Sequence, residues 1–349
     1  MNKINSESRN KTIVLLLIVG ALIYSQTLNY SFLHWDDDAH ILSHPPLTWA
    51  TLVSVFTQPY YGLFIPVTYF LWGCISLALS WFHIPPHPFP FHALNLLLHL
   101  LNSVQVYSLI KLVGLDTRAD KFKGPRTNGA GEPAGFSSGA AQVGALLFLL
   151  HPLQVGGVAW ISGGRDLLSS AFGLWATRVY INSGRKMLPT ILYGLGLLSK
   201  PSLIFLPLGL LALQPEKAKK SIPWLILCSI LGGFILFWTR AAQSYSLMPS
   251  VAWFRRPLVA IDSLGFYLRK IIFPYPLSVD YGRTPEWVLQ NNSFLLSGAC
   301  LLAFVGMLGV FRPFLPSAVK KGLGWSFFLI LPVLGWIPSA QQSISTVPH

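Results

Sequence analysis

Residues 12–41 read TIVLLLIVGALIYSQTLNYSFLHWDDDAHI, and this stretch decides the fold. Residues 12–30 carry no charge and begin with an unbroken apolar run, and a helix of about 20 such residues can cross a membrane. Asp36, Asp37 and Asp38 follow, and this tripeptide holds a quarter of the chain's 12 acidic residues. We therefore predict a first membrane helix over 12–30, followed by an acidic cluster at the membrane boundary.

The composition of the whole chain extends this prediction. Charged residues make up 11% of the 349 residues and apolar residues 52%, whereas about 25% of an ordinary soluble domain is charged. Such a chain cannot cover a water-soluble surface, so we predict an all-α polytopic membrane protein. The net charge of +13 comes from small, widely spaced basic groups, which are typical of membrane orientation signals. We expect no nucleic-acid partner.

Apolar stretches between the charge clusters predict about nine spanning helices. They lie at 12–30, 92–113, 139–151, 165–183, 187–199, 201–215, 221–238, 293–312 and 322–340. Two further stretches, 63–82 and 257–277, are long enough to span, and the positive-inside rule decides their place. If both are interfacial helices on the outer surface, the inner side receives 17 of the 25 basic residues.

This topology places the N-terminus in the cytoplasm and two long loops outside. The first outer loop, 31–91, contains the acidic cluster and one interfacial helix, and the second is 239–291. Segment 114–138 is rich in Gly, Pro and Lys, so it is predicted to be a flexible cytoplasmic linker. We find no internal repeat and no soluble repeat domain, so the whole chain, 1–349, is interpreted as one transmembrane domain.

Three interpretations of the acidic cluster remain open. It could be a solvated end to the first helix, or Asp36, Asp37 and Asp38 could hold a divalent cation. The third interpretation is catalytic: a carboxylate takes a proton from an acceptor hydroxyl. Neighbouring carboxylates raise one another's pKa, which suits a base that works near neutral pH.

The second predicted helix carries a polar face. His92, Asn95, His99 and Asn102 are spaced 3, 4 and 3 residues apart, so they share one side of the helix. Polar side chains within a membrane helix usually face other helices. They would serve either as packing contacts between helices or as the polar wall of a ligand cavity.

Two cations also lie on the outer side in this topology. Arg165, followed by Asp166, begins the helix after HPLQVGGVAWISGG, and Lys200 lies alone between two apolar runs. The lysine could simply reach the lipid headgroups, or both cations could pair with a lipid phosphate. In HIPPHPFPFH, 83–92, the histidines could suggest a metal, but the prolines favour a rigid loop.

Seven stretches of the chain together resemble a known family. In order they are WDDDAHI (35–41), YGLFIPVTYF (61–70), FHALNLLLHLLN (91–102), LLFLLHPLQVGGVAWISGGRDLLS (146–169), LLSKPSLIFLP (197–207), FYLRKIIFPYPLSVDY (266–281) and LPVLGWIP (331–338). They resemble the membrane domain of bacterial proteins related to tetratricopeptide-repeat protein O-mannosyltransferases. These belong to the GT-C class of polyprenol-dependent glycosyltransferases.

The resemblance implies a fold, a reaction and a location. It implies a GT-C-like bundle with a large first outer loop, in which an inverting transferase moves a sugar from a polyprenyl-phosphate carrier to a protein or glycan acceptor. The family's Asp-Asp maps onto Asp36 and Asp37, which would be catalytic. The expected substrate- and phosphate-binding residues are Arg165, Lys200, His151, His92, His99 and Tyr281. No cofactor is required, and we expect an integral protein of the bacterial inner membrane with its active site outside.

The chain departs from the family pattern at two points. The family has an acid five residues after the His of His-Pro, where this chain has Gly156. Relatives also continue beyond SAQQSISTVPH, so we expect a C-terminally truncated domain. The alternatives are therefore an inactive membrane scaffold and a transporter or lipid flippase, although a transporter predicts repeated halves that the sequence does not show.

Overall fold

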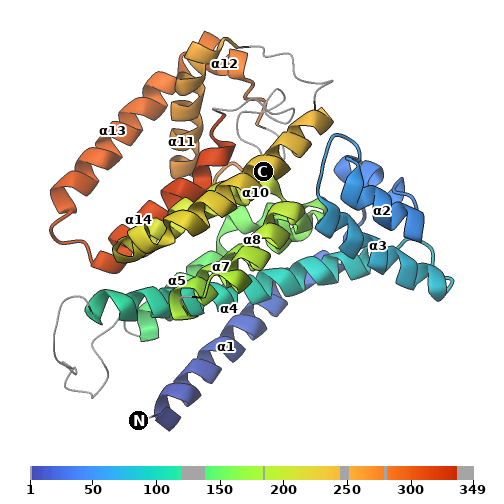
Figure 1. Cartoon of the computed structure of the whole chain (residues 1–349), viewed down its shortest axis with the longest axis horizontal. Helices are drawn as coiled ribbons and strands as arrows, with labels where there is room; N and C mark the ends of the chain where they lie inside the picture. The colour runs from blue at the N-terminus through green and yellow to red at the C-terminus, as the bar shows by residue number, and fades with distance from the viewer. Residues whose placement is uncertain (1, 120–137, 184, 244–250, 279–280, 336–349) are drawn as a thin grey trace. The chain divides into compact units, whose positions relative to one another are not determined.

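The structure, a computed structural model, describes residues 2–119, 138–183, 185–243, 251–278 and 281–335 (Figure 1). These residues form helices joined by turns and loops, which confirms the all-α class. The chain divides into two compact units. Unit 1 comprises Met1–Tyr61 and Ile65–Lys200, and unit 2 comprises Gly62–Phe64 and Pro201–His349.

The α-helices of each unit follow one another along the chain. In unit 1 they are α1 (Asn2–Tyr24), α2 (Trp49–Thr57), α3 (Pro66–Trp81), α4 (Phe89–Ala119), α5 (Ser138–Leu150), α6 (Val155–Ala159), α7 (Gly164–Ser183) and α8 (Met187–Ser199). In unit 2 they are α9 (Leu206–Leu213), α10 (Ala218–Gln243), α11 (Arg256–Ile272), α12 (Pro285–Gln290), α13 (Ser293–Phe311) and α14 (Ser317–Ile330).

Four helical segments in the described part of the chain are long and apolar enough to cross a membrane. They are Glu7–Asn29, Phe89–Gly114, Lys219–Thr239 and Ser293–Phe311. A fifth span results if Ser138–Leu150 and Pro152–Ala159, which meet at a bend of 48°, count as one. A membrane interior leaves backbone groups no water to bind, and a helix satisfies them internally. These segments indicate an integral membrane protein.

The other predicted spans form helices, but these do not meet the criteria for a complete crossing. α8 has 13 residues and α9 has 8, and at about 1.5 Å per residue each is shorter than the roughly 30 Å of a bilayer core. α7 has 20 residues but includes Arg165, Asp166 and Arg178. α14 ends at Ile330, and residues 336–340 of the last predicted span lie outside the described residues. The structure thus supports four or five of about nine predicted spans.

The two stretches predicted to be interfacial are also helical. Segment 63–82 contains α3, which begins with Pro66 at its first turn and has 16 residues, too few for a full span. Segment 257–277 contains α11, which packs against α13 in unit 2. There the buried Asp262 accepts hydrogen bonds from the Ser293 and Ser297 hydroxyls and pairs with Arg283.

Helices α1, α4 and α5 share one core in unit 1. Leu16, Tyr107, Ala141, Ala145 and Leu149 form its buried part. Gly20 allows α1 to approach α4 closely, because a Cβ there would collide with the Leu100 side chain.

Helix α4 contacts α7 through the polar face noted in the sequence. The side-chain amide nitrogen of Asn95 donates to the Trp160 carbonyl at 2.9 Å, and that of Asn102 donates to the Leu167 carbonyl at 2.9 Å. Gly164 leaves room for Asn95, since a Cβ at 164 would meet its Oδ1 atom. These amides hold the start of α7 against α4, which favours the packing interpretation for both asparagines.

Helices α7 and α8 pack closely and position Arg165 and Lys200, two of the predicted binding residues. Helix α7 contacts both α8 and α4, and α4 in turn contacts α5 (Figure 1). The Ser169 hydroxyl donates to the Gly196 carbonyl at 3.0 Å, and the Thr68 hydroxyl of α3 donates to the Ser199 carbonyl at 3.0 Å. The first turn of α7 and the end of α8 therefore lie close together, next to α3.

The predicted linker 114–138 is only partly described. Helix α4 continues to Ala119, so the first residues of the segment are helical, and residues 120–137 lie outside the described residues.

The predicted topology can be tested in unit 1 by cysteine labelling. Thr48 and Arg185 are both exposed and belong to predicted outer and inner loops. In a background without Cys74, Cys228 and Cys300, a membrane-impermeant thiol reagent should label Thr48→Cys in intact cells and Arg185→Cys only after lysis. Labelling of Arg185→Cys in intact cells would contradict the topology.

Candidate active site

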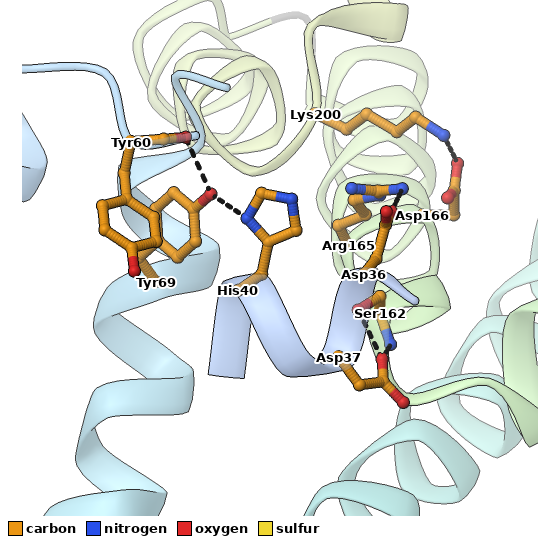
Figure 2. A network of polar contacts seen from close by, with 9 residues as sticks. All are labelled: Asp36, Asp37, His40, Tyr60, Tyr69, Ser162, Arg165, Asp166 and Lys200. Carbon is orange, nitrogen blue, oxygen red and sulfur yellow. Dashed lines mark hydrogen bonds and ion pairs between the residues drawn. The ribbon is translucent and has the colours of Figure 1, made fainter. Parts of the chain in front are cut away.

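The two acids with predicted roles lie on one short helical turn of the first loop. Asp36 and Asp37 begin the turn, which continues as a π-helical turn over Asp38–Leu42. Neighbouring residues on such a turn point in different directions, whereas residues four apart point the same way. Asp36 and Asp37 consequently have different surroundings (Figure 2).

Asp37 is fully buried and holds the loop onto unit 1. One oxygen accepts the Ser162 backbone N–H at 3.0 Å and the Ser162 hydroxyl at 2.5 Å. Its other oxygen accepts the Leu33 backbone N–H at 3.0 Å. Both carboxylate oxygens are therefore occupied by protein donors.

Asp36 is the partly accessible acid of the pair. Its side chain is 24% exposed and accepts a hydrogen bond from Arg165 Nη2 at 2.8 Å. Asp38 is more exposed and contacts His34 on the surface at 2.9 Å. Asp36 alone of the three combines an accessible carboxylate with a buried cation.

Arg165 lies in the first turn of α7 and is almost completely buried. Its side chain is 6% exposed, and its guanidinium lies over the Trp160 ring, 5.7 Å from the ring centroid. Its Nη2 atom donates to Asp36, whereas Nε and Nη1 are buried and make no hydrogen bond in the structure. A buried donor without an acceptor costs about 1–3 kcal/mol, so this guanidinium has unused capacity to bind an anion.

Lys200 and Asp166 form a second ion pair beside the first. Lys200 follows the last residue of α8, and its Nζ donates to Asp166 Oδ1. Burial lowers the pKa of Lys200, while the nearby Asp166 carboxylate raises it. The structure therefore brings together four of the predicted residues: Asp36, Asp37, Arg165 and Lys200.

A histidine that sequence reasoning did not select adjoins this cluster. His40 lies four residues after Asp36, is 6% exposed, and makes a 2.7 Å hydrogen bond from Nδ1 to the Tyr69 hydroxyl. Burial and, to a smaller extent, the Arg165 guanidinium lower its pKa to about 4, although the Asp36 carboxylate acts in the opposite direction. Its position in WDDDAHI was visible in the sequence, but its tyrosine partner on α3 was not.

The remaining predicted binding residues make other contacts, three of them in unit 1 and one in unit 2. His99 donates from Nε2 to the Leu149 carbonyl at 3.0 Å, within the α4–α5 contact, and His92 packs edge-on against Tyr30. His151 accepts the Leu153 backbone N–H at 3.2 Å and so begins a one-turn helix. Tyr281 belongs to unit 2, where Lys270 lies over its ring.

The described residues contain no group of three or more His, Cys, Asp or Glu side chains arranged to hold a metal ion. Gly156 lies exposed in α6, and a Cβ there would meet open space. Local packing therefore does not require glycine at the position where the resembling family has an acid.

Comparison with known proteins gives a partial similarity. Over 181 residues, 48% of this chain, the sequence is 30% identical to protein O-mannosyl-transferase TMTC1 of Homo sapiens. The same protein of Mus musculus is 31% identical over 181 residues. The chain spans less than a fifth of the length of these curated relatives, 18% and 16% respectively. No family model matches the chain, and no solved structure matches it significantly. The expected resemblance to an O-mannosyltransferase is thus confirmed at a distance and over about half of the chain.

Proposed function

We propose that this chain is a membrane glycosyltransferase of the GT-C kind. It would move a sugar from a polyprenyl-phosphate carrier to a hydroxyl of a protein or glycan acceptor on the outer face of the membrane. The similarity to a protein O-mannosyl-transferase supports the class of reaction. In this proposal the shorter helices complete a bundle of about nine membrane helices, and the first outer loop carries the active site.

The observation that carries the proposal is the state of Arg165. Its guanidinium is buried, pairs with Asp36 through one nitrogen and leaves two nitrogens without partners. Arginine and phosphate form strong charge-assisted hydrogen bonds. A carrier phosphate at this point would therefore supply the acceptors that the protein does not.

Lys200 would provide the second contact to the phosphate. It is held beside Arg165 by Asp166, and its side chain is 17% exposed. Because Asp36 and Asp166 already neutralise both cations, an incoming phosphate must share the cations with these carboxylates or replace them. Replacement at Arg165 would release Asp36 for its own role.

Asp36 would act as the general base. Its carboxylate would take the proton of the acceptor hydroxyl while the hydroxyl oxygen attacks the anomeric carbon of the sugar. The bond between that carbon and the phosphate oxygen would break, and its electron pair would leave with the phosphate. The product would have the opposite anomeric configuration, and the proton on Asp36 would pass to solvent.

Asp37 would act indirectly, through the position of the turn. Its two oxygens accept three hydrogen bonds, from Leu33 and Ser162, and its side chain is fully buried, so an acceptor hydroxyl does not reach it. We therefore assign the chemistry to Asp36 and the placement of the turn to Asp37.

The proposal requires no metal ion, because a departing phosphate already carries negative charge. A divalent cation at the three aspartates remains the alternative. The hydrogen bonds at Asp37 disfavour it, since cation ligation would need the same oxygens.

The test is a transfer assay with the purified full chain in lipid nanodiscs. Polyprenyl-phosphate mannose labelled in the sugar is the donor, and a peptide rich in Ser and Thr is the acceptor. We expect label in the peptide, attached with the configuration opposite to that of the donor. Movement of intact donor between the leaflets of vesicles, with neither peptide labelling nor sugar release, would instead support a flippase.

A further inference from the structure

His40 is placed to take part in the reaction. Figure 2 shows it with Tyr69 on one side and the Asp36–Arg165 pair on the other. Its Nδ1 is 2.7 Å from the Tyr69 hydroxyl oxygen. Among the described residues its Nε2 has no hydrogen-bond partner, yet this atom is not one of the unpartnered polar atoms that the protein seals from solvent.

The two contacts of the Tyr69 hydroxyl are both hydrogen bonds in one tautomer of His40 only. That hydroxyl has one hydrogen, and it donates to the Tyr60 carbonyl at 3.3 Å. The contact with Nδ1 is then a hydrogen bond only if Nδ1 carries the proton and donates to the tyrosine oxygen. In a neutral imidazole, a proton on Nδ1 leaves a lone pair on Nε2. Thus Nε2 is a hydrogen-bond acceptor.

The surroundings keep the imidazole neutral at physiological pH. The side chain is buried, with the Tyr60, Tyr61 and Tyr69 rings around it. Burial lowers its pKa to about 4, and the positive Arg165 acts in the same direction. So weak a base would leave a proton on the oxygen of an alcohol, but it can still accept a hydrogen bond.

The direction of attack identifies the group that Nε2 would meet. In an inverting displacement, the nucleophile approaches from the side opposite to the leaving group. With the phosphate at Lys200 and Arg165, the acceptor would approach the Asp36–Arg165 pair from the side away from Lys200. In Figure 2 His40 and Tyr69 lie on that side of the pair.

We propose that His40 positions the acceptor by accepting a hydrogen bond at Nε2 from a second donor of the acceptor, such as a peptide N–H beside the reacting hydroxyl. This inference rests on the proposed function. The reacting hydroxyl would give its one hydrogen to Asp36, which points the same way from the loop, four residues earlier. Tyr69 acts through His40, because it fixes the ring orientation and the tautomer.

The first test needs no activity and therefore stands apart from the proposed function. The full chain, labelled with ¹⁵N in histidine and held in nanodiscs, is studied by NMR at neutral pH. The His40 signals are identified by their loss in His40→Asn. We expect a protonated Nδ1 and an unprotonated Nε2. A protonated Nε2 would overturn the inference, because that nitrogen could not accept a hydrogen bond.

The second test separates acceptor effects from donor effects in the transfer assay. His40→Asn keeps a donor near the Nδ1 position for Tyr69 but lacks the acceptor at Nε2. We expect its KM for the peptide to rise about five- to tenfold, as for the loss of one hydrogen bond, with the KM for the donor unchanged. His40→Gln puts a carbonyl oxygen near the Nε2 position and should recover most of the loss.

The matched control is His34→Asn, whose ring is exposed and pairs with Asp38, and we expect normal kinetics. Equal losses in His40→Asn and His40→Gln, or a change in the KM for the donor, would overturn the positioning role. If no transfer occurs in the unchanged protein, the NMR measurement still decides the tautomer on which the inference depends.

Discussion

Replacing Asp36 with Asn is expected to reduce sugar transfer by about 10²–10⁴-fold, the usual contribution of a general base. An amide cannot take the proton of the acceptor hydroxyl, although its size matches the carboxylate. Because Asp36 is 24% exposed and has one protein partner, the fold and membrane insertion should remain intact. Transfer rates in nanodiscs at saturating donor, together with the thermal unfolding midpoint, measure the two effects.

Two neighbouring variants serve as controls for Asp36→Asn. Asp38→Asn alters an exposed carboxylate that contacts His34 and should transfer sugar at nearly the normal rate. Asp37→Asn puts an amide N–H where three hydrogen bonds need an acceptor, so it should lower both the unfolding midpoint and the rate. Normal activity in Asp36→Asn would remove the base hypothesis.

The difference between Asp36 and Asp37 shows where sequence reasoning ends. The acidic cluster, its place after the first helix and its assignment to the same outer side as Arg165 and Lys200 could all be predicted. The partner of Asp37 is Ser162, 125 residues away in the chain, and no local pattern indicates that contact. Two adjacent acids therefore looked equivalent until packing made one a structural anchor and left the other accessible.

The polar face of α4 shows a similar limit. A spacing of 3, 4 and 3 correctly predicted that four side chains share one side of a helix, since this follows from helix geometry. Whether such a face meets another helix or a ligand depends on what lies opposite. For Asn95 and Asn102 the opposite groups are backbone carbonyls before and within α7.

Helix lengths were the least predictable part of the fold. Hydropathy locates apolar stretches but does not say where a turn will interrupt them. The predicted segment 187–199 matches α8, which ends at Ser199 before Lys200 and Pro201, whereas the segment 201–215 contains a 3₁₀ turn and the shorter α9. Proline disfavours a helical conformation in the preceding residue, and Lys200 is indeed extended. This break brings Lys200 to Asp166.

Arg165→Gln is expected to weaken the binding of polyprenyl-phosphate sugar roughly ten- to a hundredfold. A charge-assisted hydrogen bond contributes about 1.5–3 kcal/mol, and about 1.4 kcal/mol corresponds to a tenfold change in affinity. Lys200→Gln should have an effect of similar size, because the lysine would contact the same phosphate. The measurement is a donor titration in nanodiscs, by direct binding and by transfer rate.

The control is Arg185→Gln, which removes an exposed cation of unit 1 outside the cluster and should leave donor affinity unchanged. If Lys200 served only to reach the lipid headgroups, Lys200→Gln would change insertion slightly and donor affinity not at all. Unchanged affinity in both Arg165→Gln and Lys200→Gln would mean that the phosphate is bound elsewhere. The unpartnered nitrogens of Arg165 argue for weaker donor binding in Arg165→Gln, since they are buried donors that a phosphate oxygen can satisfy by charge-assisted hydrogen bonds.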